Sequence, residues 1–149
     1  MVQIGKFSKI LVAIDGSPNS FEAIDHGIAM AKKDGAKLFV LNIIHTPGSV
    51  LLYSTEKSFR EFLKKSKDEA EVWFNKIRKK ASEFGVELKT DTIEEIYSIP
   101  GAIIKYAEKE KVDVIVVGGT GKSGFKKLLL GSVSGDVVRY ARCPVLVVK

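Results

Sequence analysis

The chain has 149 residues, of which 45% are hydrophobic and 28% are charged, a balance typical of a soluble globular protein. This length is sufficient to bury a core, and we expect one domain over residues 1–149. The longest apolar runs, such as residues 114–117, are far too short to cross a bilayer, and residues 1–6 lack the apolar region of a signal peptide. One cysteine, Cys143, excludes an internal disulfide and fits a reducing compartment, so a cytoplasmic location is expected.

The formal net charge of +6 raises the question of nucleic-acid binding. Most lysines, however, are interspersed with acidic residues along residues 56–84, and a helix face of mixed charge is usually only solvated. The sequence also lacks the combination of aromatic and basic residues that is typical of RNA-binding motifs. Nucleic acid and membrane are therefore not expected partners.

The first strand and helix are predicted from an apolar run and from capping residues. Residues 10–14 are apolar without alternation, which indicates a strand buried on both faces. Ser17 has the position of an N-cap and Pro18 that of the first helical residue. Apolar residues then recur at helical spacing until Gly35, which we expect to end the helix.

The middle of the chain predicts a second strand, a loop and one long helix. Residues 38–44 form the strand, and residues 45–55 contain a proline and a glycine that favour a loop. A long apolar stripe then predicts a single helix over residues 57–84. Trp73 and Phe74 lie on this stripe and are expected to be core residues.

The second half of the chain continues the alternation of strands and helices. Alternating residues at 86–93 indicate a more exposed strand at a sheet edge. The remaining elements are predicted as a helix over 98–110, a strand over 112–117, a helix over 132–141 and a strand over 145–148. Five strands connected by four helices imply an α/β fold, a doubly wound parallel sheet with helices on both faces. Ligands of such sheets bind beyond the carboxyl ends of the strands, where the strand order switches.

The most informative stretch is the connection from the fourth strand to the last helix. An apolar strand leads into a glycine-rich segment, and a new helical pattern begins after Gly131-Ser132. Glycines let the backbone approach a ligand closely, and the N–H groups at a helix start attract anions. The stretch therefore predicts a phosphate-binding site.

A P-loop is one alternative for this stretch. Gly121-Lys122-Ser123 supplies the second half of that motif, but the first glycine would fall on Val116 inside the strand. Gly124 also intervenes before any helix begins. A P-loop is therefore disfavoured.

A dinucleotide fingerprint is the second alternative, because Gly119, Gly121 and Gly124 match its spacing. That motif should open the first strand–helix–strand unit and be followed by an acidic residue about 20 positions on. Here it lies in the last third of the chain, and no acid stands at the expected distance. This alternative is also disfavoured.

The third pattern is Gly118-x2-Gly121-x9-Gly131-Ser132, with a strand before it and a helix after it. In this context the chain resembles the universal stress protein family, specifically its ATP-binding branch. The resemblance runs from residues 9–15 to residues 144–148, whereas residues 46–98 match in layout only. It implies a five-stranded parallel sheet in a Rossmann-like, three-layer sandwich of the adenine nucleotide alpha hydrolase type, with strand order 3-2-1-4-5.

Asp15 follows the first strand and has two interpretations. As a turn residue it would accept hydrogen bonds from the backbone amides after it. As a site residue it would meet a ribose hydroxyl or a metal on the phosphates, and the resemblance favours this role because the family's acidic position faces the nucleotide.

The phosphate site would be formed by residues on both sides of the glycine-rich segment. Gly118, Gly121 and Gly131 would keep the backbone open, and Lys122 and Ser123 could reach the phosphates. The helix start would contribute backbone N–H groups, from Ser132, Val133 and Ser134.

The base-binding residues are implied only by the resemblance. The backbone near Ile43 would pair with the adenine edge, and Ala13 and Val117 would line the base or the ribose. His26 and His45 have no spaced metal-ligand partners, so a protein metal site is not expected. No catalytic residue is predicted.

We expect a regulatory module that binds ATP, ADP or AMP, with Mg²⁺ or Mn²⁺ on the phosphates. The resemblance implies a homodimer through residues 145–148, and pairing would remove an apolar sheet edge. Two alternatives remain, namely a slow ATP hydrolase and a dimeric scaffold that binds no nucleotide. The first lacks an evident base or water-positioning residue, and the glycine pattern argues against the second.

Overall fold

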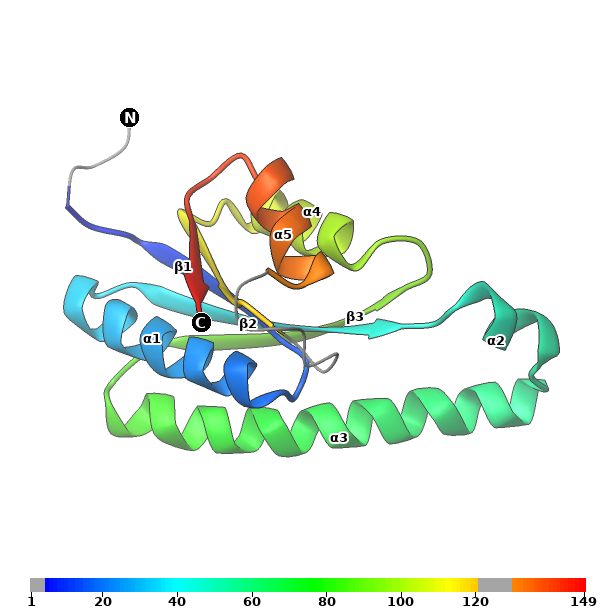
Figure 1. Ribbon diagram of the computed structural model, residues 1–149. Helices are drawn as coiled ribbons and strands as arrows, with labels where there is room; N and C mark the ends of the chain where they lie inside the picture. Colours follow the sequence, from blue (N-terminus) through cyan, green and yellow to red (C-terminus); the bar gives the residue numbers. More distant parts are fainter. Residues whose placement is uncertain (1–4, 121–129) are drawn as a thin grey trace.

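The computed structural model describes residues 5–120 and 130–149. Its centre is a five-stranded parallel sheet in the order β3-β2-β1-β4-β5 (Figure 1). The strands are β1 (Lys9–Ile14), β2 (Lys37–His45), β3 (Leu88–Glu95), β4 (Val114–Gly118) and β5 (Val145–Val148). The helices are α1 (Pro18–Asp34), α2 (Gly48–Tyr53), α3 (Glu56–Glu83), α4 (Ile99–Glu110) and α5 (Ser132–Tyr140). The predicted fold class and strand order are confirmed.

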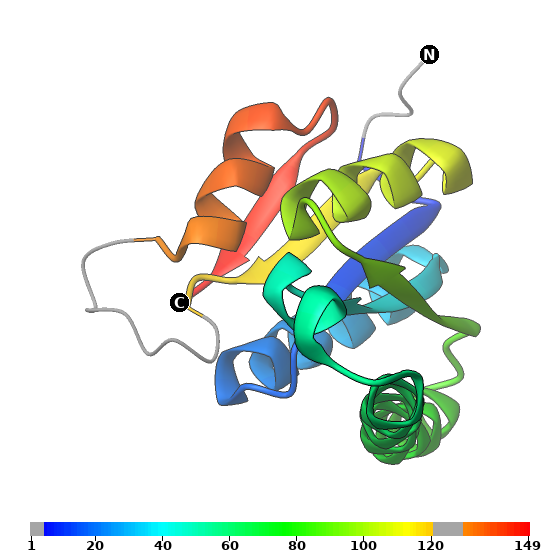
Figure 2. The same ribbon diagram turned by 90° about the vertical axis from the view of Figure 1, so that its right-hand side faces the viewer.

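Two helical layers cover the sheet, with α1 and α3 on one face and α4 and α5 on the other (Figure 2). Successive side chains of a strand point to opposite faces, so β1 contributes to both cores. Val12 and Ile14 pack with α1 and α3, whereas Leu11 packs with α4 and α5. The apolar run without alternation is therefore explained by burial on both faces, as predicted.

The predicted helix ends are confirmed where capping residues define them. Ser17 accepts a hydrogen bond from the Ser20 amide at the start of α1, and Gly35 ends this helix at φ +67°. Ser98 caps α4 in the same way, through the Gly101 amide at 3.0 Å. Such caps satisfy amides and carbonyls that a helix leaves without partners.

The loop predicted over residues 45–55 is wrong in part. His45 still belongs to β2, and residues 48–53 form the short helix α2. The Pro47 carbonyl accepts the first helical hydrogen bond, from the Val50 amide at 3.0 Å. A proline before a helix is compatible with its start, and α2 buries none of its residues, so no apolar periodicity marks it.

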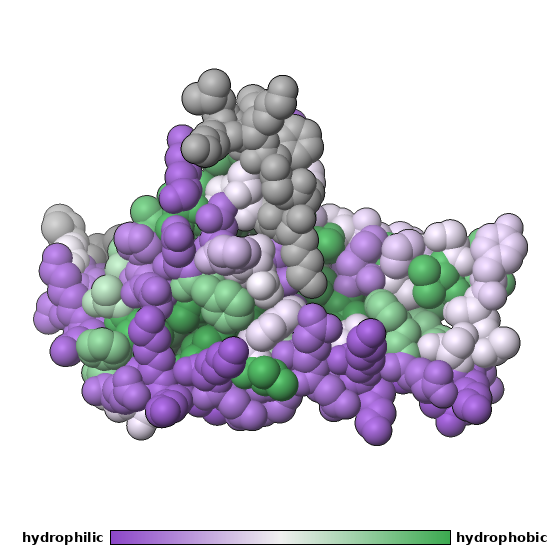
Figure 3. Space-filling model, turned by 60° about the horizontal axis from the view of Figure 1, so that its bottom comes forward, coloured by the Kyte–Doolittle hydropathy of each residue, from purple (hydrophilic) through white to green (hydrophobic). Residues whose placement is uncertain are grey.

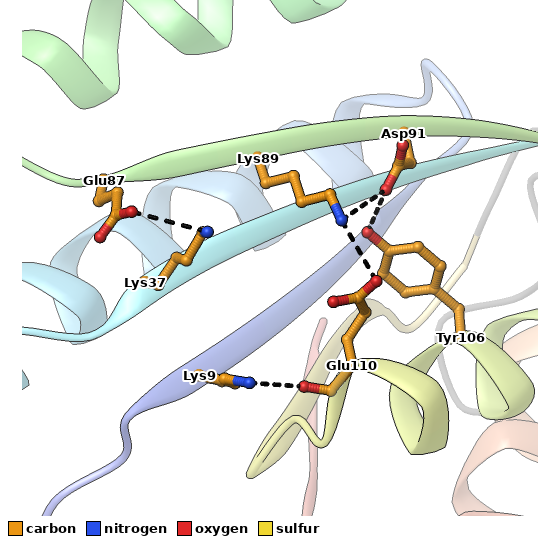
Figure 4. A network of polar contacts seen from close by, with 7 residues as sticks. All are labelled: Lys9, Lys37, Glu87, Lys89, Asp91, Tyr106 and Glu110. Carbon is orange, nitrogen blue, oxygen red and sulfur yellow. Dashed lines mark hydrogen bonds and ion pairs between the residues drawn. The ribbon is translucent and has the colours of Figure 1, made fainter.

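The strand predicted from residue 86 begins two residues later, at Leu88, and it runs on to Glu95. Its predicted place at the sheet edge is confirmed, because β3 pairs only with β2. A group of polar contacts connects this edge to α4 (Figure 4). Lys89 Nζ lies 3.2 Å from a Glu110 carboxylate oxygen and 3.7 Å from that of Asp91. The Tyr106 hydroxyl donates to Asp91, and burial and this carboxylate raise the pKa of Tyr106.

Helix α3 is longer than the strands it covers. Its 28 residues span about 42 Å, against about 30 Å for the nine residues of β2. The buried residues of α3 all lie in its second half, at positions 70, 74, 77 and 81. The first half extends beyond the body of the sheet beside α2 (Figure 1), and the outer surface of α3 is mostly hydrophilic (Figure 3). No helix in the described ranges combines the length and apolar character of a membrane span.

Candidate functional site

A pocket of about 510 Å³ lies at the carboxyl ends of β1, β2 and β4. This volume is within the range of small-molecule sites, and the position is the switch in strand order. Half of the lining comes from β1, β2, β4 and the segments that follow them, namely Ala13, Ile14, Asp15, Ser17, Asn42, Ile43, Ile44, His45, Val117, Gly118 and Thr120. Helices contribute the rest, namely Ser20, Phe62, Ser66, Glu69, Trp73, Ile99, Ile103, Ser132, Val133 and Ser134, with Gly131 at the α5 cap.

The turn from β1 to α1 positions Asp15. Its Oδ1 accepts a hydrogen bond from the Ser17 amide at 2.9 Å, and Gly16 between them has φ +84°. The role of Asp15 as a turn residue is therefore present in the structure. The same carboxylate lines the pocket, so the turn holds it at the edge of the site.

The end of β4 is packed tightly against the first turn of α1. A Cβ atom at Gly118 would lie 3.0 Å from the backbone carbon of Asn19. The Asn19 side chain also donates to the hydroxyl of Thr120. Glycine at position 118 therefore permits a close approach of β4 to α1 at the edge of the pocket.

The N-terminus of α5 faces the same pocket. Gly131 is the N-cap residue, and its amide donates to the Gly119 carbonyl at 2.7 Å. The buried hydroxyl of Ser134 donates to the carbonyls of Gly119 at 3.0 Å and Gly131 at 3.2 Å. No side chain in the described part of the chain caps this helix. The first-turn residues Ser132 and Val133 line the pocket, so the positive end of the helix dipole lies beside it.

An apolar wall completes this side of the pocket. Ala13, Ile43 and Val117 project from three adjacent strands toward α4 and α5, where Ile99 and Val133 pack with them. An apolar surface beside a helix N-terminus suits a ligand with a flat apolar part and an anionic part.

The structure brings together nine of the twelve residues predicted for the site. These nine line the pocket: Ala13, Asp15, Ile43, Val117, Gly118, Gly131, Ser132, Val133 and Ser134. The other three, Gly121, Lys122 and Ser123, lie outside the described residues.

Four lining residues from α3 were missed: Phe62, Ser66, Glu69 and Trp73. Trp73 was expected in the core, but only its neighbour Phe74 is fully buried, at 3% exposure. Trp73 packs at the margin of the core and faces the pocket. The signal was the same helical stripe that predicted α3, since residues 62, 66, 69 and 73 share one helix face.

Within residues 5–120 and 130–149, no group of three His, Cys, Asp or Glu side chains is placed to hold a metal ion. His26 is exposed on α1. His45 lines the pocket, and its buried Nδ1 has no hydrogen-bond partner among the residues that the structure describes. A cation in the pocket would therefore need ligands from a bound molecule or water.

The fold and the pocket define a doubly wound α/β protein with a pocket at the switch in strand order, where such folds bind ligands. The sequence model of the universal stress protein family matches residues 6–149, and the chain belongs to this family.

The chain is similar to several known sequences and solved structures. Universal stress protein MJ0531 of Methanocaldococcus jannaschii is 38% identical over 143 residues, which cover 96% of this chain and 82% of the relative. The solved structure of hypothetical protein MJ0577 is 31% identical, covers 95% of both chains and superposes with a TM-score of 0.84. An Arabidopsis thaliana family member solved with AMP bound shares the fold, with 20% identity, coverage of 95% and 91%, and a TM-score of 0.68.

Proposed function

We propose that this chain binds an adenine nucleotide, with ATP as the first candidate. The observation that carries the proposal is the pairing, in one pocket, of an apolar wall with an uncapped helix N-terminus. The proposal is supported by family membership and by the AMP complex of the Arabidopsis relative.

The pocket suggests how the nucleotide is oriented. We assign adenine to the apolar wall of Ala13, Ile43 and Val117, and the ribose to Asp15 at the end of β1. The phosphates belong at Gly118 and at the cap and first turn of α5, Gly131 and residues 132–134, where backbone N–H groups are available. Gly121, Lys122 and Ser123 remain predicted phosphate contacts in the connection between these elements.

A divalent cation is part of the proposal for ATP. Among the residues to which the nucleotide is assigned, Asp15 carries a carboxyl group, and the described lining contains no lysine or arginine. A triphosphate placed there needs positive charge, which Mg²⁺ or Mn²⁺ on its oxygens supplies. We therefore expect ATP affinity to depend on the cation more strongly than AMP affinity.

We propose that the protein acts as a regulatory module, that it forms a homodimer and that it is located in the cytoplasm. The strand β5 has a free edge among the described strands, and its Leu146 is 38% exposed. The Gly119 amide donates to the Val148 carbonyl at 2.7 Å, so the site and this edge strand are directly connected. Pairing of β5 with that of a second copy would cover the edge. Slow ATP hydrolysis is not favoured by any observation on the pocket.

The test is to identify small molecules that the purified protein releases when it is denatured, by mass spectrometry. Recovery of an adenine nucleotide near one per chain supports the proposal and shows which adenylate is preferred. Recovery of a different ligand at that stoichiometry contradicts it.

A further inference from the structure

The pocket extends to both faces of the sheet at its carboxyl edge. Ala13 and Ile43 point toward α4 and α5, where the adenine is placed above. Asn42 is in register with Ile14, whose side chain belongs to the core beneath α1 and α3. Because paired residues of neighbouring strands point to the same face, Asn42 lines the opposite part of the pocket. We name this part the α3-side compartment; it is lined by Asn42, Ile44, Phe62, Ser66, Glu69 and Trp73.

The overhang of α3 forms the outer wall of this compartment. Phe62, Ser66, Glu69 and Trp73 lie at positions i, i+4, i+7 and i+11 of the helix, which places them on one face. The indole of Trp73 lies directly over Gly16, where an added Cβ would be only 2.3 Å from an indole carbon. The helix is thus held against the β1–α1 turn at one end of the wall, while its first half continues past the strands (Figure 1).

Asn42 supplies the compartment with a polar group. The residue is 5% exposed, and its side chain lines the pocket. Its amide atoms are open to the pocket, because among the described residues the buried side-chain atom without a hydrogen-bond partner is His45 Nδ1. The amide can therefore form hydrogen bonds to water or to a molecule bound in the compartment.

The remaining lining selects a positively charged group. Glu69 forms no ion pair with a described residue, and the described lining holds no lysine or arginine. Phe62 and Trp73 add aromatic faces, which attract cations. A carboxylate, an amide oxygen and serine hydroxyls together accept hydrogen bonds from a donor that carries several N–H groups.

We propose that the α3-side compartment binds an organic cation, an ammonium or guanidinium group on an apolar body. The group would donate to Glu69 and Asn42 and stack against Trp73. The inference goes beyond nucleotide binding and stands independently of it, because it uses residues on the other face of the sheet.

Trp73 makes the proposal measurable, since it is the only tryptophan of the chain. The probes are benzylammonium, its neutral analogue benzyl alcohol, and N-acetylargininamide, each titrated while tryptophan fluorescence and heat are recorded. We expect saturable binding of a cation and at least tenfold weaker binding of the alcohol. Tight binding of benzylammonium indicates a free amine as the natural ligand, and preference for N-acetylargininamide indicates a side chain of a partner protein.

The decisive variant is Glu69→Gln, with Asp68→Asn as its matched control. Both remove one negative charge from adjacent exposed positions of α3, but only Glu69 lines the pocket. Glu69→Gln should weaken cation binding about tenfold, whereas Asp68→Asn should leave it within twofold. Equal effects of the two variants, equal binding of the alcohol, or no binding of any cation would overturn the proposal. ATP titrations of the same proteins distinguish the two sites. If Glu69→Gln loses cation binding but keeps ATP binding, the substitution affects the α3-side compartment and not the nucleotide site.

Discussion

Substitution of Gly131, the N-cap residue of α5, tests whether the phosphates bind at the N-terminus of this helix. A Cβ at this position would lie 3.4 Å from the Gly119 carbonyl oxygen and 3.6 Å from Ser134 Oγ, which are ordinary contacts. The backbone φ of −61° is also accessible to every residue. Gly131→Ala should therefore fold normally, with a loss of at most about 1 kcal/mol from the poorer N-cap.

Gly131→Val adds two methyl groups about 1.5 Å beyond that Cβ. Gly119 and Ser134 are already in contact with that Cβ, so we expect the methyl groups to extend into the space beside the first turn of α5 and to hinder access to its amides. Loss of one hydrogen bond to a charged phosphate oxygen costs about 2 kcal/mol, which corresponds to a roughly thirtyfold higher Kd for ATP.

The assay is a calorimetric ATP titration of the wild type, Gly131→Ala and Gly131→Val, with circular dichroism and thermal unfolding as controls of the fold. We expect Gly131→Ala to bind within a fewfold of the wild type and Gly131→Val to lose most of its affinity while it stays folded. Unchanged ATP binding by a folded Gly131→Val would refute the assignment of the phosphates to the α5 N-terminus.

Three further predictions concern stability and assembly. Tyr106→Phe should lower the free energy of unfolding by about 1 kcal/mol at neutral pH. Because the pKa of Tyr106 is raised in the folded protein, its stabilising contribution is present below about pH 10 and is lost as the pH rises further. In urea titrations, the free energy of unfolding of the wild type should therefore converge on that of the variant above about pH 10. Tyr140→Phe, at an exposed position, is the control, and the same pH dependence for both variants would contradict this account. Gly16→Ala should lower the free energy of unfolding by more than about 1 kcal/mol and shift the fluorescence of Trp73. The new methyl group overlaps the indole, and residue 16 has a positive φ that alanine rarely adopts. An unchanged emission spectrum and an unchanged unfolding midpoint would show that the contact between Gly16 and Trp73 is not maintained. Leu146→Lys should yield a monomer in analytical ultracentrifugation if β5 pairs with that of a second copy, and an unaltered dimer would place the interface elsewhere.

The fold was largely predictable because its strands and helix ends carry strong local signals. The uninterrupted apolar run of β1 indicates burial on both faces, and Ser17 and Gly35 bound α1 through capping chemistry. α2 was missed because it buries no residue, and without a buried face a short helix has no periodicity to detect. Its preceding Pro47 is equally compatible with a loop.

The candidate site was predictable where its residues stand at the carboxyl ends of neighbouring parallel strands. Asp15 follows β1 and Gly118 is the last residue of β4, and the carboxyl ends of neighbouring parallel strands lie at the same edge of the sheet. Glu69 and Trp73 were not predictable in this way, because their role depends on how far α3 extends beyond the sheet. A helical stripe is the same in sequence whether it faces a core or a pocket.

The most direct test of the central claim is a calorimetric titration of the wild-type protein with ATP, in the presence and absence of Mg²⁺, with GTP as the comparison. We predict saturable binding near one ATP per chain, tighter with Mg²⁺, and weaker binding of GTP because the pocket is assigned to adenine. Absence of heat with ATP under both conditions, from protein shown to be folded and free of bound nucleotide, would contradict the claim. The glycines around the pocket would then be structural turns.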